Sequence, residues 1–100
     1  MRIEVYGKQG CSLCKSAMKK VEFFLDKNAA SQGVELRFMD VETEHGAAEG
    51  DFFDVFEIPT VLLVRDGAQV LARWDGKPPS TGDLQAHLCS GSDGRQCAAA

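Results

Sequence analysis

Two cysteines separated by two residues are the feature of this sequence with the clearest potential for chemistry. Cys11 and Cys14 enclose the dipeptide Ser12-Leu13. The pair lies between a short alternating segment and a run of helical periodicity, so we expect it at the start of a helix. The unpaired N–H groups and the positive end of the helix dipole stabilise a thiolate there. Because the thiolate is the species that attacks a disulfide, the spacing points to thiol–disulfide exchange.

The two cysteines are expected to have different roles. Cys11 is the outer residue, where solvent can reach it, and we assign it as the nucleophile. Cys14 lies one turn inside the helix and is the resolving thiol, which attacks Cys11 in a mixed disulfide and releases the reduced substrate. The positive charges of Lys8 and Lys15 can add to the potential at this site.

Other interpretations of the pair stay open. Two neighbouring cysteines can be buried thiols without chemistry, or the sensing element of a redox-responsive or adaptor domain without turnover. A metal or iron–sulfur carrier would use Cys11 as a ligand, and a structural zinc site normally has four ligands. The remaining candidate ligands contain no compact pair, so we expect no metal site: Cys89, Cys97, His45 and His87.

A proline directly before an apolar run is the second feature of interest. Pro59 precedes Thr60 and the segment 61–64, although proline lacks the N–H that a strand ladder needs. A cis bond between Ile58 and Pro59 would free the backbone groups of Ile58 to pair with an extended substrate. From the local sequence alone, a trans proline that begins a strand is the simpler interpretation.

The periodicity of the chain predicts the elements that must position these residues. Alternating or continuous apolar segments predict strands at 2–6, 34–41, 60–64 and 68–74, and helical spacing predicts helices at 11–30, 43–56 and 80–89. We expect the first three strands to be parallel through right-handed crossovers. The Asp66-Gly67 turn would add the fourth strand as an antiparallel edge. The predicted α/β fold is a mixed four-stranded sheet, in β-α-β-α-β-β-α order, with helices on both faces.

The composition fits a small globular protein and excludes several classes. The 100 residues are 44% hydrophobic and 26% charged, with a net charge of −4. An acidic chain without a dense basic stretch is poorly suited to nucleic acid or to anionic membranes. The first residues lack the apolar segment of a signal peptide, and four cysteines are too few for a secreted disulfide scaffold. We therefore expect a cytoplasmic protein. We also expect it to be a monomer.

The last residues are expected to form a tail outside the domain. We place the domain at 1–89 and a flexible segment at 90–100, which has few groups that could build a core. Cys89 and Cys97 could close into a disulfide, or Cys97 could reach Cys11 as a regulatory partner. The plainer interpretation is that Cys89 packs on the last helix and Cys97 is incidental.

Over residues 1–89 the sequence resembles the thioredoxin/glutaredoxin superfamily. Residues 5–14 are similar to the glutaredoxin segment around the first cysteine, with Lys8 in the place of the basic residue that contacts the glutathione carboxylate. Residues 55–67 are similar to the cis-proline strand and hairpin of thioredoxins. The resemblance implies a thioredoxin fold, a cis Ile58–Pro59 bond and a thiol–disulfide oxidoreductase. It places the contacts to substrate at Lys8, Ser12, Leu13, Ile58, Pro59 and Thr60.

The departures from the family pattern affect the expected substrate and electron donor. Ser12-Leu13 replaces the usual dipeptides of the family. Val5 stands where thioredoxins have a buried aspartate, so that carboxylate is missing unless Asp40 or Glu57 supplies it. Glu57 also precedes the Ile-Pro pair and would repel a glutathione carboxylate. We therefore expect protein disulfides as substrates rather than glutathione mixed disulfides. No bound cofactor is expected, and the candidate electron donors are a flavoprotein reductase and glutathione.

Overall fold

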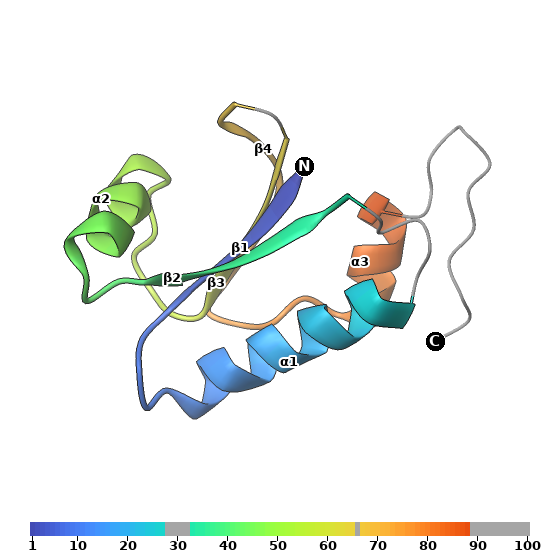
Figure 1. Ribbon diagram of the computed structural model, residues 1–100, viewed down its shortest axis with the longest axis horizontal. Helices are drawn as coiled ribbons and strands as arrows, with labels where there is room; N and C mark the ends of the chain where they lie inside the picture. Colours follow the sequence, from blue (N-terminus) through green and yellow to red (C-terminus); the bar gives the residue numbers. More distant parts are fainter. Residues whose placement is uncertain (28–32, 66, 89–100) are drawn as a thin grey trace.

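The computed structural model describes residues 1–27, 33–65 and 67–88 (Figure 1). The elements follow the predicted order, and their hydrogen-bonded strands form one sheet in the order β2-β1-β3-β4. The predicted helix end near residues 30–33 lies partly outside the described residues. Asp66, Cys89 with the predicted domain boundary, and Cys97 lie outside them altogether. The elements are β1 (Arg2–Gly7), α1 (Ser12–Lys27), β2 (Glu35–Asp40), α2 (Glu44–Phe52), β3 (Thr60–Arg65), β4 (Gln69–Asp75) and α3 (Thr81–Leu88).

The direction of β3 differs from the sequence prediction. β1 and β2 are parallel, but β3 runs antiparallel to β1, so the expectation of three parallel strands was wrong. Asp40 at the end of β2 pairs with Gly7, and Thr60 at the start of β3 pairs with Tyr6. The chain therefore leaves and re-enters the sheet at the same end. The segment 41–59 does not have to travel back along the sheet, so the crossover rule for parallel strands does not apply to it.

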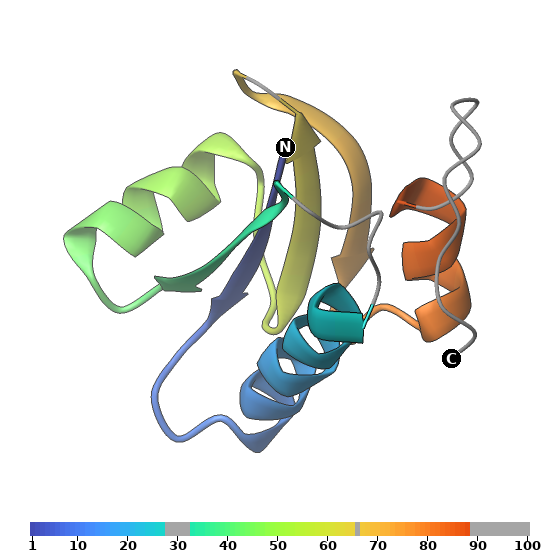
Figure 2. The ribbon, with the colours of Figure 1, turned by 45° about the vertical axis from the view of Figure 1, so that its right-hand side comes forward.

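Helices cover both faces of the sheet, as predicted (Figure 2). α1 and α3 pack on one face, where Val21, Phe24 and Leu84 meet Ile3 and Val5 in an apolar core. The other face packs against α2 and the residues that follow it, where Phe53 meets Tyr6, Leu62 and Val64. The strand residues of the two cores alternate along β1 and β3, as the period of two requires.

β1 is buried on both faces, although charged and apolar residues alternate along it. Glu4 has no exposed surface, and it is held by two neighbours on its own face of the strand. The Tyr6 hydroxyl donates to Glu4 Oε1 at 2.7 Å, and Arg2 Nε donates to Glu4 Oε2 at 2.7 Å. Burial raises the pKa of the Tyr6 phenol, and its hydrogen bond to Glu4 raises it further. Both carboxylate oxygens are satisfied, which makes the buried charge tolerable.

A bulge interrupts the alternation predicted for β4. Leu63 pairs with Ala72 but Val64 pairs with Val70, so Leu71 is an extra residue in the ladder. One inserted residue reverses the faces on either side of it. Val70 therefore does not share a face with Ala72 and Trp74, which strict alternation along 68–74 would require. Trp74 packs in the core beside α1 and α3.

Side-chain hydroxyls cap the N-termini of α2 and α3. The Thr43 hydroxyl accepts the Gly46 N–H at 3.0 Å and donates to the Asp40 carbonyl at 2.7 Å, which joins β2 to α2. Ser80 accepts the Asp83 N–H at 3.0 Å at the start of α3. Side chains of this type supply an acceptor for the free N–H groups of the first turn. In the described part of the chain, no helix combines the length and apolar character that a membrane crossing requires.

The two glycines of α2 allow a matched test of this packing. A methyl group at Gly46 would collide with the backbone carbonyl of Asp40, whereas one at Gly50 would lie 3.7 Å from Val55 Cβ in ordinary contact. Gly46→Ala should destabilise the protein by about 1–3 kcal/mol through overpacking. Gly50→Ala should stabilise it by up to about 1 kcal/mol through helix propensity. Urea unfolding of both variants measures the difference, and equal effects would contradict this packing of α2.

Candidate active site

Cys11 and Cys14 form a disulfide at the start of α1, with their Cα atoms 5.2 Å apart. Cys11 immediately precedes the first helical residue and occupies the N-cap position. The Cys14 N–H donates to Cys11 Sγ at 3.2 Å, and the Lys15 N–H donates to the Cys11 carbonyl at 3.1 Å. The sulfur of Cys11 thus takes the place of the usual side-chain oxygen acceptor, and it faces the positive end of the helix.

The two sulfur-bearing residues differ in exposure. Cys14 is only 1% exposed, whereas Cys11 is partly accessible to solvent. Gly7, the last residue of β1, accounts for the close packing of Cys14, because a Cβ at position 7 would lie 2.7 Å from both Cys14 Cβ and Cys14 Sγ. The sequence predicted the outer and inner placement of the pair. It gave no indication of the role of Gly7, because the contact joins a strand end to the next helix.

The loop before β3 lies at the same end of the sheet as the first turn of α1 (Figures 1 and 2). The Ile58–Pro59 peptide bond is cis. The Gly76 N–H donates to the Pro59 carbonyl at 2.8 Å, and the Thr60 hydroxyl donates to the Glu57 carbonyl at 2.6 Å. These bonds attach the loop to the end of β4 and to itself. The loop is therefore held in one conformation beside the disulfide end of the molecule.

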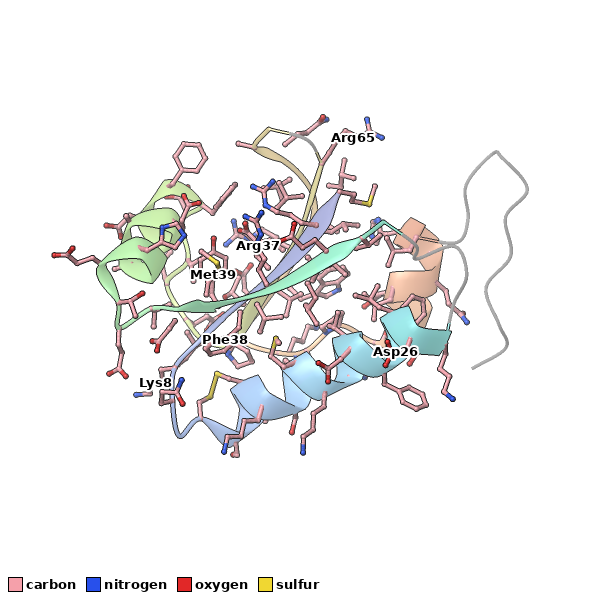
Figure 3. All side chains as sticks on the ribbon, viewed as in Figure 1. Lys8, Asp26, Arg37, Phe38, Met39 and Arg65 are labelled. Carbon is pink, nitrogen blue, oxygen red and sulfur yellow. A yellow bond between two sulfur atoms is a disulfide. The ribbon has the colours of Figure 1, made fainter. Side chains whose placement is uncertain are left out.

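The predicted substrate contacts differ in their access to solvent. Lys8, Ser12 and Leu13 are exposed around the disulfide, and Leu13 exposes 57% of its surface. Ile58 is partly exposed. Pro59 and Thr60 are buried. Their contact with substrate stays a prediction. Figure 3 shows the side chains of Lys8 and Phe38 on either side of the disulfide.

Arg73 is a residue of this region that the sequence did not reveal. Its guanidinium donates from Nη1 to the Phe53 carbonyl at 2.9 Å and from Nη2 to the Asp54 carbonyl at 3.0 Å. Asp75 accepts further hydrogen bonds from Arg73, and these hold the pKa of the Asp75 carboxyl below its usual value. Arg73 therefore ties β4 to the chain that leaves α2 and leads to Ile58. In the sequence, Arg73 and Asp75 are simply two charged residues on the same side of a strand, a pattern typical of a solvated face.

The carboxylates that could replace the missing buried aspartate have other contacts. Val5 packs in the apolar core at that position, as its sequence implied. Asp40 accepts the Glu42 N–H at 2.9 Å, where β2 ends. The Glu57 carboxylate lies against Gly76, where an added Cβ would be 2.9 Å from Glu57 Cδ.

The described side chains offer no cluster suited to a metal ion. Within residues 1–27, 33–65 and 67–88, no three His, Cys, Asp or Glu side chains gather where they could hold a metal ion. His45 is exposed on α2, and His87 lies on α3 with its ring edge-on to Trp74, 5.8 Å between centroids. These two histidines therefore lie on different elements, away from the start of α1.

Comparison with solved structures identifies the fold. Thioredoxin 1 from Thermosipho africanus aligns with a TM-score of 0.68 and 20% identity over 88% of this chain and 94% of its own. Thioredoxin-2 of a malaria parasite aligns at 0.71 and 19% over 90% and 82%, and a thioredoxin-fold protein from Helicobacter pylori at 0.69 and 17% over 89% and 69%. No family model and no curated protein sequence matches the chain. The predicted thioredoxin fold is confirmed.

Arg73 and Arg37 provide a matched test of the loop attachment. Each pairs with an acidic residue two positions away on its own strand, but only Arg73 also donates to distant main-chain carbonyls. Arg73→Met should lower the free energy of unfolding by about 1–3 kcal/mol, because the partly buried Phe53 carbonyl loses a charged donor and the Asp54 carbonyl loses a second one. Arg37→Met should cost less than about 1 kcal/mol, because it breaks an exposed ion pair. Urea unfolding measures both values. A cost for Arg73→Met no larger than that for Arg37→Met would show that the loop is held by other contacts.

Proposed function

We propose that this protein is a thiol–disulfide oxidoreductase that exchanges electrons with protein disulfides through Cys11 and Cys14. The observation that carries the proposal is the Cys11–Cys14 disulfide at the start of α1, with the Cys14 N–H directed at Cys11 Sγ. An amide donor and a helix N-terminus both favour the thiolate over the thiol. The thioredoxin fold supports a redox role but does not by itself define the reaction.

In the proposed reaction, the reduced protein transfers two electrons to its substrate. The Cys11 thiolate attacks one sulfur of the substrate disulfide, forms a mixed disulfide and expels the first substrate thiolate. Cys14 loses its proton and attacks Cys11 Sγ, which forms the Cys11–Cys14 bond and expels the second substrate thiolate. The substrate is reduced and the protein oxidised. The burial of Cys14 and the exposure of Cys11 fit this order, because an incoming protein can reach only the outer sulfur.

The oxidised protein needs a two-electron donor to complete the cycle. We propose that this donor is the dithiol of a flavoprotein reductase or two molecules of glutathione, and that the protein functions as a cytoplasmic monomer without a bound cofactor. Protein disulfides are preferred to glutathione mixed disulfides because Glu57 directly precedes Ile58 and Pro59. A carboxylate at this point would repel the carboxylates of glutathione.

Single cysteine substitutions test the assignment. With dithiothreitol as donor, Cys11→Ser should reduce insulin disulfides only at the uncatalysed background rate, because the attacking sulfur is absent. Cys14→Ser should lose part of the rate and accumulate a mixed disulfide at Cys11, because the second attack is blocked. Insulin turbidity and mass spectrometry of trapped intermediates measure the two effects.

Cys89→Ser is the matched cysteine control and should retain the rate of the unsubstituted protein. An equal loss from Cys89→Ser would contradict the roles given to Cys11 and Cys14. Retention of activity in Cys11→Ser would favour a redox-sensing or adaptor domain without turnover. Stoichiometric metal in the purified protein, lost on Cys11→Ser, would favour the metal or iron–sulfur carrier.

A further inference from the structure

A cavity of about 260 Å³ lies beside the disulfide, between the start of α1 and β2. Its floor is apolar and its rim is basic. Phe38 exposes 36% of its surface there, a large value for an aromatic residue on a strand. The floor is formed by Cys14, Met18 and Phe38, and the rim by Lys8, Lys15 and Lys19.

The lysines of the rim belong to the one strongly basic segment of an acidic sequence. Residues 8–20 contain four lysines and no acidic residue, whereas the whole chain has 15 acidic and 11 basic residues. All the lysines of the rim are exposed, so their charge is available to a partner. An acidic partner would be attracted to this end of the molecule and a basic partner repelled from it.

The helix dipole does not favour the lysine nearest to the start of α1. The first turn of this helix contains no acidic residue, although the dipole favours acids there and disfavours cations. Lys15 lies at the end of that turn, where its charge works against the dipole, whereas Lys19 lies a turn further on, where the effect has faded. The position of Lys15 on the cavity rim provides a reason for its presence that the helix dipole does not.

We propose that this cavity binds an acidic segment of the target protein next to its disulfide, an inference that rests on the function proposed above. An apolar side chain of the segment would contact Phe38 and Met18, and carboxylates on either side of it would meet Lys8, Lys15 and Lys19. The apolar floor favours a polypeptide over a small inorganic anion, because an anion gains nothing from a phenyl ring and a thioether. The rim thus selects targets by charge, and the floor fixes the register of the segment beside Cys14.

Lys19 and Lys20 allow a matched test. They are adjacent and exposed on the same helix, so reversal of either changes the net charge equally, but only Lys19 lines the cavity. We would use two peptides with the same internal disulfide and a neighbouring leucine, one flanked by aspartates and one by lysines. Hydroxyethyl disulfide is the neutral small substrate. Peptide KM is measured for the unsubstituted protein, Lys19→Glu and Lys20→Glu at low and high salt.

The unsubstituted protein should prefer the acidic peptide at low salt, and high salt should reduce the preference. Lys19→Glu should raise the KM for the acidic peptide about fivefold, whereas Lys20→Glu should change it by less than about twofold. Both variants should reduce hydroxyethyl disulfide at the unchanged rate. Equal effects of Lys19→Glu and Lys20→Glu would overturn the cavity site in favour of general electrostatics. The absence of a preference between the two peptides would also overturn the cavity site.

A second measurement separates failure of the site from failure of the proposed function. The acidic peptide with serines in place of its cysteines is titrated into the oxidised protein and followed by NMR. Binding that shifts the Phe38 and Lys19 amides, and that weakens in Lys19→Glu, supports the site even if no disulfide is reduced. Failure to reduce insulin disulfides, with this binding intact, would refute the proposed function alone. Oxidised glutathione that competes for the same amides would overturn the assignment to a polypeptide.

Discussion

The close approach of β1 to the first turn of α1 is the constraint on which the candidate site depends. Gly7 has no side chain, and any Cβ there would overlap Cys14. This contact sets the depth of the helix start against the sheet, so that Cys14 is buried while Cys11 caps the helix at the surface. The different environments of the two sulfurs, on which the proposed exchange relies, follow from one missing side chain.

The rest of the fold brings the other functional segments to the same end of the sheet. β1 and β2 finish there, and β3 begins there after a loop held by Thr60 and Gly76. Arg73 on β4 also holds the chain that leads to this loop, through the carbonyls of Phe53 and Asp54. The opposite face of β1 carries a buried ionic pair, in which both oxygens of Glu4 are occupied. The candidate site thus lies at one end of the sheet, and both oxygens of the buried Glu4 carboxylate are paired.

Local features of the fold could be predicted from the sequence, and long-range ones could not. Helical periodicity, the caps at Thr43 and Ser80, and the cysteines at a helix start depend on neighbouring residues, which a sequence displays directly. The antiparallel direction of β3 and the bulge at Leu71 depend on pairing between distant segments. For the same reason Arg73, whose partners lie 19 and 20 residues away, could not be distinguished from a solvated arginine.

A redox titration of the metal-free protein tests the central claim most directly. Thiols would be trapped by alkylation at each potential, and the disulfides mapped by mass spectrometry. We expect Cys11 and Cys14 to form one two-electron disulfide with a midpoint between roughly −180 and −300 mV, an interval that overlaps the potentials of known exchange catalysts. The position in that range would indicate whether the protein acts as reductant or oxidant. Failure of this disulfide to form, or pairing of Cys11 only with Cys89 or Cys97, would contradict a dithiol mechanism.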